Sequence, residues 1–450
     1  MQHGTRRWTL ALCLLVGTLA VLAATAAGAG IREPTVITVP GTYLLERNLS
    51  VPDGTVAIEV RVPNVTIEGN GWTIAGRDAA NSCGILVHAP AGRVRNVTVR
   101  NLNVRDLQFG CYFWNTENTS VEDCLIESCT YGITFNPALR GCVTASRIER
   151  NDYGFAISGG SAASTVRSNR ITDSVRTGIY LYRTRGGLVT DNYLANVRNV
   201  YVGDQASGIN WTAGPVPGPS AAGGPLIGGN FWGRPNGGGF SQTAVDADRN
   251  GICDRIYRVS GYMVDTLPLR ERTNRATPVA GFAATPSSGT APLIVRFNDT
   301  SRGDAGLWEW SFGDGTSSIR RNATHRYAEP GRYAVTLRVR DTAGSNASIR
   351  TGSITVAAPV KRPAAAFRAT ARVGAAPLAV QFTDISTGSP RAWRWTFGDG
   401  TSSTERNPRH VYREAGSYTI GLRVTNAAGV STRTATRFIT VTVSSKEKGY

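Results

Sequence analysis

The sequence predicts an all-β protein in which a parallel β-helix is followed by two β-sandwich domains. Two internal repeats carry this prediction: one with a period of 22 to 24 between positions 64 and 200, and one with a period of 85 in the C-terminal third. Neither repeat shows the 3.6-residue period of an amphipathic helix. We expect the β-helix with its C-terminal cap over residues 31–272, the sandwiches over 273–358 and 359–443, and a tail over 444–450.

The shorter repeat predicts the rungs of the β-helix. A valine column recurs at spacings of 24, 22, 23 and 23, and a glycine column at spacings of 22, 22 and 24. The columns are Val97, Val121, Val143, Val166 and Val189, and Gly110, Gly132, Gly154 and Gly178. Rungs of this kind stack about 4.8 Å apart, so each valine is expected to lie above the previous one in a continuous core.

Polar corners and a first strand complete the predicted β-helix. Asn169 and Asn192 stand at equivalent positions of neighbouring repeats, and we expect them to form a hydrogen-bonded ladder. Residues 35–43 are expected to form the first strand and turn, which would cap an otherwise open sheet edge. Residues 212–229 are rich in proline, glycine and alanine and predict a loop before the C-terminal cap.

The longer repeat predicts the tandem sandwiches. Residues 282–356 map onto 367–441 at a constant offset of 85 without a gap. Alternating apolar residues such as Tyr333, Val335 and Leu337 have the two-residue period of a half-buried strand. Short strands separated by Gly, Pro and Asp turns are typical of a β-sandwich.

Three motifs in each sandwich resemble those of the polycystic-kidney-disease (PKD) domain, an immunoglobulin-like β-sandwich. They are W-x-F-G-D-G at 310–315 and 395–400, H-x-Y at 325–327 and 410–412, and G-x-Y at 331–333 and 416–418. The resemblance implies spacer and adhesion modules on secreted or surface proteins. Asp314 and Asp399, inside the first motif, are expected to shape a tight turn.

Residues 35–270 resemble the right-handed parallel β-helix of NosD-like proteins, within the pectate-lyase-like superfamily. The resemblance is strongest at the end of this segment, in G-N-F-W at 229–232, the acidic run at 246–254 and D-x-x-P-L at 265–269. NosD-like proteins are linked to copper-enzyme maturation, so the resemblance also implies a copper-handling alternative. Copper prefers imidazole, thiolate or thioether donors. After removal of a signal peptide, the candidates are His88, His325, His410, Met263 and the cysteines.

The N-terminus predicts export. Residues 1–30 combine Arg6 and Arg7 with an apolar run and small residues, the layout of a signal peptide, and we expect cleavage near Ala29. No other apolar run reaches the ~18 residues of a membrane span, so we expect a secreted or surface-associated mature chain without a transmembrane segment.

Export bears on the cysteines and the asparagines. Six cysteines would remain in the mature chain, where they can form disulfides or serve as apolar core residues. Eight N-x-S/T sequons are candidate glycosylation sites where the asparagine faces solvent. They begin at Asn48, Asn64, Asn96, Asn118, Asn210, Asn298, Asn322 and Asn346.

The charge favours acidic partners. The formal net charge is +17, and all but three of the 49 basic residues are arginine, whose planar guanidinium suits carboxylate and sulfate groups. Acidic surface glycans are therefore plausible partners, and a solvated arginine-rich surface is the alternative. Nucleic acid is not expected, because an exported chain without a nucleic-acid-binding motif offers no basis for it.

Asp246, Asp248, Asn250 and Asp254 predict a structural calcium site. They occupy positions 1, 3, 5 and 9 of a calcium-loop pattern around Gly251, and hard cations prefer oxygen ligands in this arrangement. Tyr257 stands where an EF-hand has a bidentate Glu. A metal-free Asx turn is therefore the alternative.

An enzyme is the second functional class that the sequence allows. Asp106 and Asp152 are expected to share a column two rungs apart, roughly 9 to 10 Å by rung spacing, which could suit an inverting glycosidase. No known lyase or hydrolase motif accompanies them. The favoured interpretation is a nonenzymatic, exported surface protein that binds glycans or proteins, with a polysaccharide lyase or hydrolase as the alternative.

Overall fold

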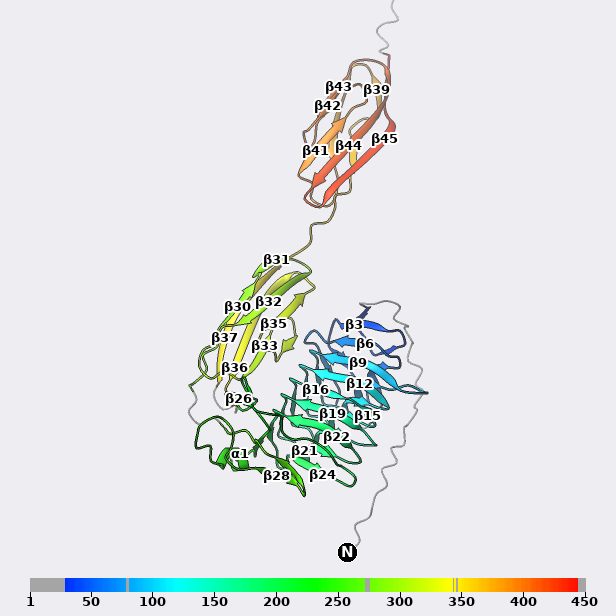
Figure 1. Ribbon diagram of the computed structural model, residues 1–450. Coiled ribbons are helices and arrows are strands. Elements are labelled where there is room, and N and C mark those ends of the chain that lie inside the picture. The colour runs from blue at the N-terminus through cyan, green and yellow to red at the C-terminus, as the bar shows by residue number, and fades with distance from the viewer. Residues whose placement is uncertain (1–28, 78–80, 272–275, 343, 345–346, 444–450) are drawn as a thin grey trace, which may run out of the picture. The chain divides into compact units, whose positions relative to one another are not determined.

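The computed structural model describes residues 29–77, 81–271, 276–342, 344 and 347–443 (Figure 1). The fold is all-β, as predicted: a parallel β-solenoid is followed by two β-sandwiches. The chain divides at Val356 into one unit that holds the solenoid and the first sandwich, and a second unit that holds the second sandwich. The predicted signal peptide lies outside the described residues, apart from its expected end at residues 29 and 30.

Three parallel sheets, called here A, B and C, form the solenoid, and successive rungs between β3 and β24 contribute strands to all three. Sheet A contains β1 (Ala29–Ile31), β3 (Gly41–Leu45), β6 (Val65–Glu68), β9 (Val94–Arg100), β12 (Thr116–Glu122), β15 (Ala138–Leu139), β16 (Cys142–Thr144), β19 (Ala162–Arg167) and β22 (Arg185–Thr190). Sheet B contains β2 (Thr35–Ile37), β5 (Val56–Val60), β8 (Cys83–Val87), β11 (Phe109–Phe113), β14 (Tyr131–Phe135), β18 (Tyr153–Ile157), β21 (Thr177–Leu181) and β24 (Val200–Val202). Sheet C contains β4 (Leu49–Ser50), β7 (Thr73–Ala75), β10 (Asn103–Arg105), β13 (Leu125–Glu127), β17 (Arg147–Glu149), β20 (Arg170–Thr172), β23 (Tyr193–Ala195) and β27 (Phe231–Gly233).

The strand register confirms the glycine column and corrects the valine column. Val99, not Val97, lies in register with Val121, and Val97 pairs with Thr119 instead. Both Val97 and Val99 are fully buried, because residues two apart in a strand face the same side. The hydrophobic pattern of the sequence therefore does not distinguish Val97 from Val99 as the first residue of the valine column.

The glycine column is required by close packing of neighbouring rungs. A Cβ atom built on Gly132 would lie 2.5 Å from the carbonyl oxygen of Gly154. No side chain can be accommodated at that distance without moving the backbone. The same contact recurs at Gly110, which faces Gly132, and at Gly154, which faces Gly178.

The predicted asparagine ladder is present and extends beyond the repeat. The side-chain amide of Asn169 donates to Oδ1 of Asn192 at 3.1 Å, and that of Asn192 donates to Oδ1 of Asn230 at 2.9 Å. All three side chains are buried, and each amide also donates to a backbone carbonyl, as Asn192 does to Val166. The ladder therefore satisfies the buried polar groups at the corner between sheets A and C.

The C-terminal cap depends on one buried carboxylate. Its elements are β25 (Val216–Pro217), β26 (Leu226–Ile227), α1 (Phe240–Thr243), β28 (Tyr257–Ser260) and β29 (Met263–Asp265). Asp265 accepts hydrogen bonds from the backbone N–H of Asn230 at 2.6 Å and from Nε1 of Trp232 at 2.8 Å. This link joins the G-N-F-W motif to the D-x-x-P-L motif. Burial raises the pKa of Asp265, because these donors only partly replace water.

The sandwiches have equivalent two-sheet topologies. The first contains β30 (Phe282–Thr285), β32 (Leu293–Asp299) and β35 (Ala323–Tyr327) in one sheet, and β31 (Ser288–Thr290), β37 (Ala347–Ala357), β36 (Gly331–Arg340), β33 (Leu307–Ser311) and β34 (Ser317–Ser318) in the other. The second contains β38 (Phe367–Ala369), β40 (Leu378–Asp384) and β43 (Arg409–Tyr412) in one sheet, and β39 (Val373–Ala375), β45 (Gly429–Thr442), β44 (Gly416–Asn426), β41 (Ala392–Thr396) and β42 (Ser402–Ser403) in the other.

The motifs of the first sandwich form one buried network. Asp314 accepts from the hydroxyl of Thr316 at 2.6 Å, and its other oxygen lies 2.7 Å from Nε2 of His325. Burial by itself would raise the pKa of Asp314, but the hydrogen bonds and charge from His325 outweigh it and lower the pKa. Tyr327 donates to the carbonyl of Phe312 at 3.0 Å. The turn is therefore structural, as predicted.

The six described cysteines are free thiols, so no disulfide of the kind we considered is present among them. Cys111 and Cys124 are fully buried in the solenoid core, and burial raises the pKa of Cys124 to about 12. They match the alternative of apolar core residues. No helix among the described residues is long and apolar enough to cross a membrane.

The asparagine ladder generates the first prediction. Asn192→Ala leaves the N–H of Asn169 and the carbonyl of Val166 without their side-chain partner inside the solenoid. Because each unsatisfied buried group costs about 1–3 kcal/mol, we expect the free energy of unfolding to fall by about 2–4 kcal/mol. Asn298→Ala, at an exposed position of β32, is the control and should change it by less than about 0.5 kcal/mol. Urea denaturation of the two variants measures both, and equal midpoints would contradict a stabilising role for the ladder.

Candidate functional site

The candidate site lies where sheet C of the solenoid meets the first sandwich, within one unit of the chain. Arg147, Arg170 and Tyr193 begin three successive strands of sheet C and lie in register with one another. In each of the two arginine strands the following residue points into the core, so the first residue points outward. The rung repeat therefore places three long side chains in one outward column.

The first sandwich meets this column through polar contacts. Nη1 of Arg147 lies 2.9 Å from a carboxylate oxygen of Glu309, and Arg170 donates to the carbonyl of Thr342 at 2.8 Å. One rung earlier, Arg320 pairs with Asp123 at 2.8 Å. The two domains therefore share ion pairs across a common boundary.

A glycine permits the closest approach of the two domains. Ser317 donates its backbone N–H to the carbonyl of Gly71 at 2.9 Å. Gly71 has a φ of 76°, and a Cβ atom there would lie 2.0 Å from the carbonyl oxygen of Ser317. Any larger residue at position 71 would force the backbones apart.

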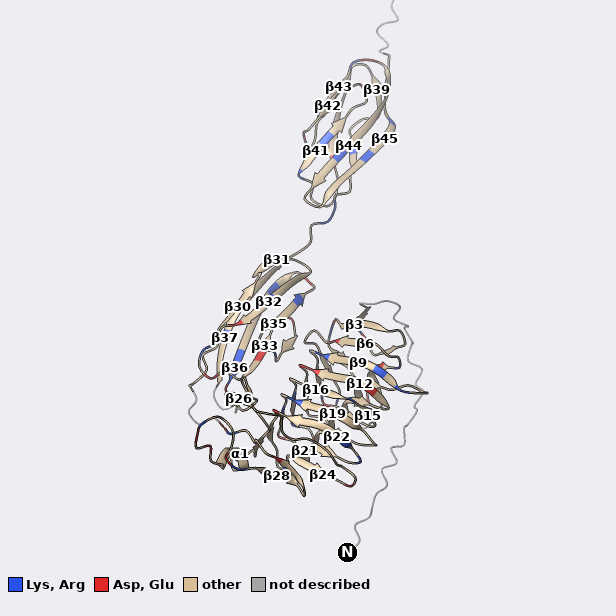
Figure 2. Ribbon diagram, viewed as in Figure 1, with Lys and Arg blue, Asp and Glu red and all other residues tan. Residues whose placement is uncertain are grey.

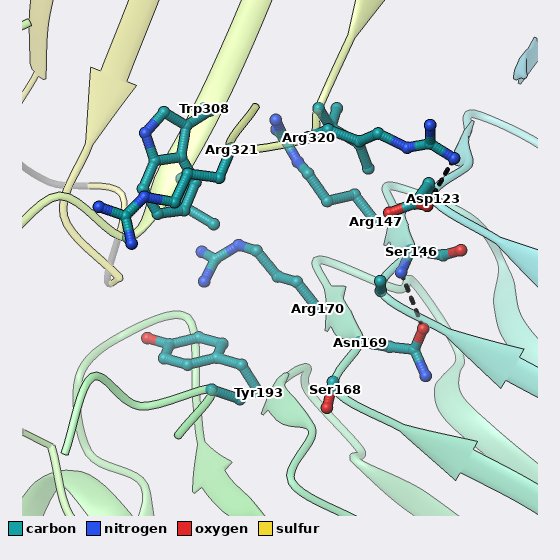
Figure 3. Close-up of a pocket in the computed structure, with 15 residues that line it drawn as sticks. Asp123, Ser146, Arg147, Ser168, Asn169, Arg170, Tyr193, Trp308, Arg320 and Arg321 are labelled. Carbon is teal, nitrogen blue, oxygen red and sulfur yellow. Dashed lines mark hydrogen bonds and ion pairs between the residues drawn. The ribbon is translucent and has the colours of Figure 1, made fainter. Parts of the chain in front are cut away.

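A cavity of about 240 Å³ lies along this boundary (Figure 3). Four arginines line it, together with Tyr193 and Trp308, and Asp123 is the one acidic residue among the described residues of the lining. The arginines are Arg147, Arg170, Arg320 and Arg321. Guanidinium groups thus reach the cavity from both the solenoid and the sandwich.

Aromatic rings hold two of these guanidinium groups in place. The Arg170 guanidinium lies 4.3 Å from the ring centroid of Tyr193, and the Arg321 guanidinium lies 5.5 Å from the Trp308 ring. Tyr193 also stacks on Phe231. Since these rings already contact other side chains, a ligand in the cavity would meet charged N–H groups rather than a free aromatic face.

Glu149 balances the positive charge behind the cavity. It is buried and pairs with Arg147 at 3.0 Å, Arg170 at 3.5 Å and Arg150 at 3.6 Å. Burial by itself would raise the pKa of Glu149, but these three arginines outweigh it and lower the pKa. Burial also acts to lower the pKa of Arg147, and the carboxylates of Glu149 and Glu309 reverse this and raise it.

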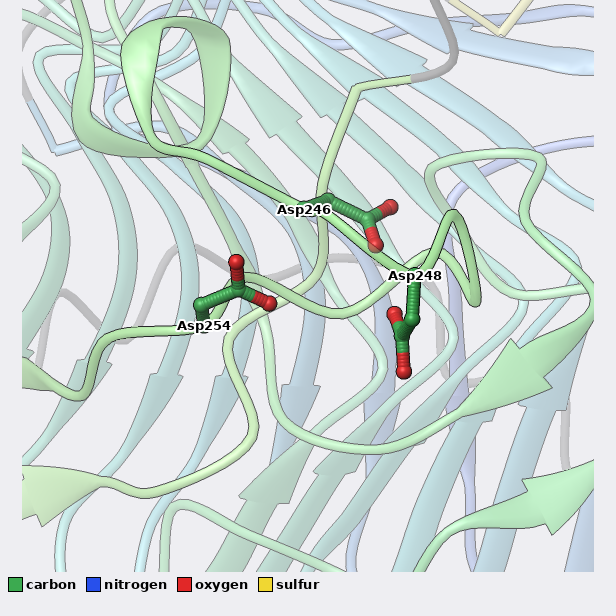
Figure 4. Close-up of side chains that lie close together, drawn as sticks. All are labelled: Asp246, Asp248 and Asp254. Carbon is green, nitrogen blue, oxygen red and sulfur yellow. The ribbon is translucent and has the colours of Figure 1, made fainter.

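The predicted calcium loop brings three carboxylates together (Figure 4). Ligand oxygens of Asp246, Asp248 and Asp254 all lie within 4.8 Å of one another. Over the described residues this is the one group of three or more His, Cys, Asp or Glu side chains so arranged. Burial raises the pKa of Asp246, and the neighbouring Asp248 adds to the rise.

The other residues of the loop form turns. The side-chain oxygen of Asn250 accepts from the N–H of Ile252 at 2.8 Å, and Gly251 has a φ of 87°. Tyr257 stacks on Trp232, with ring centroids 4.3 Å apart. Tyr257, which stands where an EF-hand has its last carboxylate, therefore packs in the cap.

Asp106 and Asp152 do not share a column, which corrects the expectation for this pair. Arg105 lies in register with Glu127 and Glu149, so Asp106 corresponds to Ser128 and Arg150. Asp152 directly precedes Tyr153, which lies in register with Tyr131. Asp152 therefore stands two positions beyond Arg150, the residue that continues the column of Asp106, and this shift moves the two aspartates to different columns.

The candidate copper ligands are dispersed among other partners. His88 lies 2.6 Å from Glu59, His325 pairs with Asp314, and His410 lies 2.6 Å from Asp399. Met263 is buried in the cap. Each of these three histidines therefore has a carboxylate partner of its own, and the described part of the chain does not bring the three together.

The sequons lie in different settings. Asn64, Asn96 and Asn118 form an exposed ladder, in which the Asn96 amide donates to Asn64 at 2.8 Å and the Asn118 amide to Asn96 at 3.2 Å. The side-chain oxygens of Asn48, Asn210 and Asn322 accept backbone N–H groups. Asn298 is exposed in β32, and Asn346 lies outside the described residues.

Sequence reasoning missed the arginine-lined cavity. The spacing between Arg147 and Arg170 equals one repeat of the solenoid and could have shown that they share a column. Their pairing with Glu309 and Thr342, which lie far along the chain in the first sandwich, has no sequence signal because it depends on how that sandwich docks.

Comparison with known proteins matches both halves of the chain. Residues 91–185 and 143–237 match the family described as periplasmic copper-binding protein (NosD), and residues 275–356 and 356–441 match the PKD domain. The chain joins a NosD-like β-solenoid to two PKD domains.

Relatives cover only parts of the chain. A 55-residue stretch is 44% identical to collagenase ColA of Bacillus cereus and spans 12% of this chain and 6% of the collagenase. The PKD1 domain of Vibrio anguillarum Epp is 29% identical, with a TM-score of 0.17, and the match covers 19% of this chain and all of that domain. A solution NMR structure of a Methanosarcina mazei protein is 32% identical, with a TM-score of 0.16, over 25% of this chain and 79% of that one.

The buried position of Glu149 generates a prediction about stability. Glu149→Gln leaves Arg147, Arg150 and Arg170 short of a counter-charge, so we expect the free energy of unfolding to fall by about 3–5 kcal/mol. Glu127→Gln, on a half-buried glutamate paired with Arg150, should cost only about 0.2–1 kcal/mol.

The lowered pKa of Glu149 sets the sign of its pH dependence. Its contribution is complete above the unfolded pKa of glutamate, about 4.3, and is lost as the pH falls through the lower folded pKa. Denaturation measured between pH 7 and pH 2.5 should therefore show that the free energy of unfolding falls at the acid end. This fall should be smaller in Glu149→Gln than in the wild-type protein. Parallel pH profiles would rule out this role.

We propose that the loop at Asp246, Asp248, Asn250 and Asp254 binds calcium structurally. A cation would relieve the repulsion among the three clustered carboxylates. Millimolar calcium should then raise the melting temperature through selective binding to the folded state, and a chelator should reverse the rise. Asp248→Asn should weaken the response, whereas Asp204→Asn, elsewhere in the solenoid, should leave it intact. An unchanged melting temperature would leave the turn as the role of this segment.

Proposed function

We propose that this is an exported, nonenzymatic surface protein that binds acidic glycans in the cavity between its solenoid and its first PKD domain. The observation that carries the proposal is the cavity lining, in which four arginines face one aspartate. Export rests on the predicted signal peptide and on the classes of protein in which PKD domains occur. By holding a glycan without cleaving it, the protein would serve in adhesion or assembly at a cell surface.

The guanidinium groups are positioned for carboxylates. Arg170 is held over Tyr193 and by the carbonyl of Thr342, and Arg321 is held by a 3.1 Å contact with Asp299. Planar guanidinium groups fixed in this way can form two parallel hydrogen bonds to one carboxylate, which an ammonium group cannot do. A uronic acid carries both such a carboxylate and hydroxyl groups for the remaining donors.

Two carboxylates behind the cavity keep this positive lining compatible with the fold. Glu149 and Glu309 contact Arg147, which is itself 11% exposed. They neutralise much of the charge on the protein side, while Arg320 and Arg321 are 32% and 65% exposed. Arg320 and Arg321 are paired with Asp123 and Asp299, so an incoming anion would meet the remaining exposed N–H groups of these two arginines.

Binding without cleavage is favoured over catalysis. The carboxylate pair considered for hydrolysis, Asp106 and Asp152, lies in different columns and pairs with Arg105 and Arg176. A lyase or hydrolase acting at the cavity would need a base or acid there. Among the described lining residues, Asp123 is the one acidic group, and it is paired with Arg320.

The cavity generates a binding prediction. In titration calorimetry with trigalacturonate, Arg170→Gln and Arg321→Gln should each weaken binding at the cavity about tenfold or more, since each removes a charge-assisted hydrogen bond. Arg326→Gln, an exposed arginine of β35 in the same sandwich, removes the same charge elsewhere and should have little effect. Binding should also weaken with added salt.

The same samples test the enzyme alternative. Equal affinities in all variants would refute the cavity as the binding site. Release of unsaturated or reducing sugar ends from polygalacturonate, abolished by Asp123→Asn, would replace adhesion with catalysis as the function of the cavity.

A further inference from the structure

The two PKD sandwiches share a fold but carry opposite charges on one face. In the first sandwich, Glu309 on β33 contacts Arg147 of the solenoid, and Arg320 contacts Asp123. At the repeat offset of 85, the second sandwich has Arg394 and Glu405 at these positions. Both contact positions are therefore reversed in charge, and the second copy cannot make these ion pairs with an equivalent surface.

The reversal creates a repulsive cross-strand pair. In the first sandwich, Glu309 on β33 lies directly opposite Arg338 on β36. In the second, Arg394 on β41 lies directly opposite Arg423 on β44. Opposite charges across neighbouring antiparallel strands stabilise a sheet, and like charges destabilise it. The second sandwich therefore holds an arginine pair that its own stability does not explain.

The arginine pair is accessible and lacks an acidic partner. Arg394 and Arg423 are both exposed, and no carboxylate of the described residues forms an ion pair with either. They border a cavity of about 190 Å³ together with Ala392, Trp393 and Thr425. The cavity lies within the second sandwich alone.

Small and hydroxyl-bearing residues surround the pair. Thr396 lies opposite Gly421, and Thr432 lies opposite Arg423 on the same outer face. These outward positions hold none of the aromatic anchors that dominate protein–protein interfaces. Polar surroundings with two guanidinium groups suit a carboxylated sugar better than a cluster of protein side chains.

The whole second sandwich is basic. Residues 357–443 contain eleven arginines, one lysine and four acidic residues. Figure 2 shows basic positions on β41, β44 and β45. A polyanion would therefore be attracted to this domain over a range of about 8–10 Å at physiological ionic strength.

We propose that the outer face of β41 and β44 is a second glycan site, in which Arg394 and Arg423 together bind a carboxylate of a polyuronate chain. The ligand carboxylate takes the place of the charge that Glu309 supplies in the first sandwich. This site extends the proposed function to a second surface and does not require the cavity at the solenoid.

The test is calorimetric titration of the full chain with trigalacturonate. We expect two sites in the wild-type protein and one in Arg394→Glu. The same substitution restores an opposite-charge pair with Arg423, so the amides of β41 and β44 should exchange with solvent about threefold more slowly. Loss of binding together with gain of local stability distinguishes a ligand site from a structural residue.

A matched control separates this site from general charge effects. Arg368→Glu changes the charge equally on an exposed arginine of β38, in the other sheet, and should keep both sites. An unchanged stoichiometry in Arg394→Glu, an equal loss in Arg368→Glu, or equally tight binding of a glutamate tripeptide would overturn the proposal. Arg170→Gln tests the cavity at the solenoid, and Arg394→Glu tests the face of β41 and β44. If only one of the two sites binds the glycan, only the variant at that site will change binding.

Discussion

Register between successive rungs is the constraint on which the solenoid and its site depend. Because each strand pairs with the equivalent strand of the next rung, residues at equivalent positions stack in columns about 4.8 Å apart. Inward-facing columns form the hydrophobic core, and the asparagine column makes the hydrogen bonds that the buried polar groups at the corner need. The column of Arg147, Arg170 and Tyr193 forms part of the outward-facing surface of sheet C. A slip of one residue would turn every such column to the opposite face.

This constraint explains why the cavity is preorganised. The strand register fixes the spacing of Arg147 and Arg170, and buried Glu149, on the same strand as Arg147, contacts both. The first sandwich then closes the column through Glu309 and Thr342. Charged side chains that would be mobile on an open surface are therefore held by two domains. Such preorganisation lowers the entropy lost when a ligand binds.

The fold was largely predictable because both repeats are visible in the spacing of residues along the sequence. Spacings of 22 to 24 reported the rungs, and the constant offset of 85 reported the sandwiches. The errors came where a shift of two positions leaves the pattern intact: Val97 and Val99 are equally buried, and Asp106 and Asp152 are nearly two repeats apart. The cavity could not be predicted, because Arg147 finds Glu309 only after the sandwich docks.

The duplicated sandwiches show how one core can support two surfaces. Trp310 and Trp395 are both buried and donate to equivalent backbone carbonyls at 2.8 and 2.9 Å, so the interior is maintained. Outward positions such as 309 and 394 contribute little to that interior and are free to differ in charge. In the first copy the acidic residue binds the solenoid. In the second copy, the same position presents an arginine to solvent, where its charge is available to a partner outside the domain.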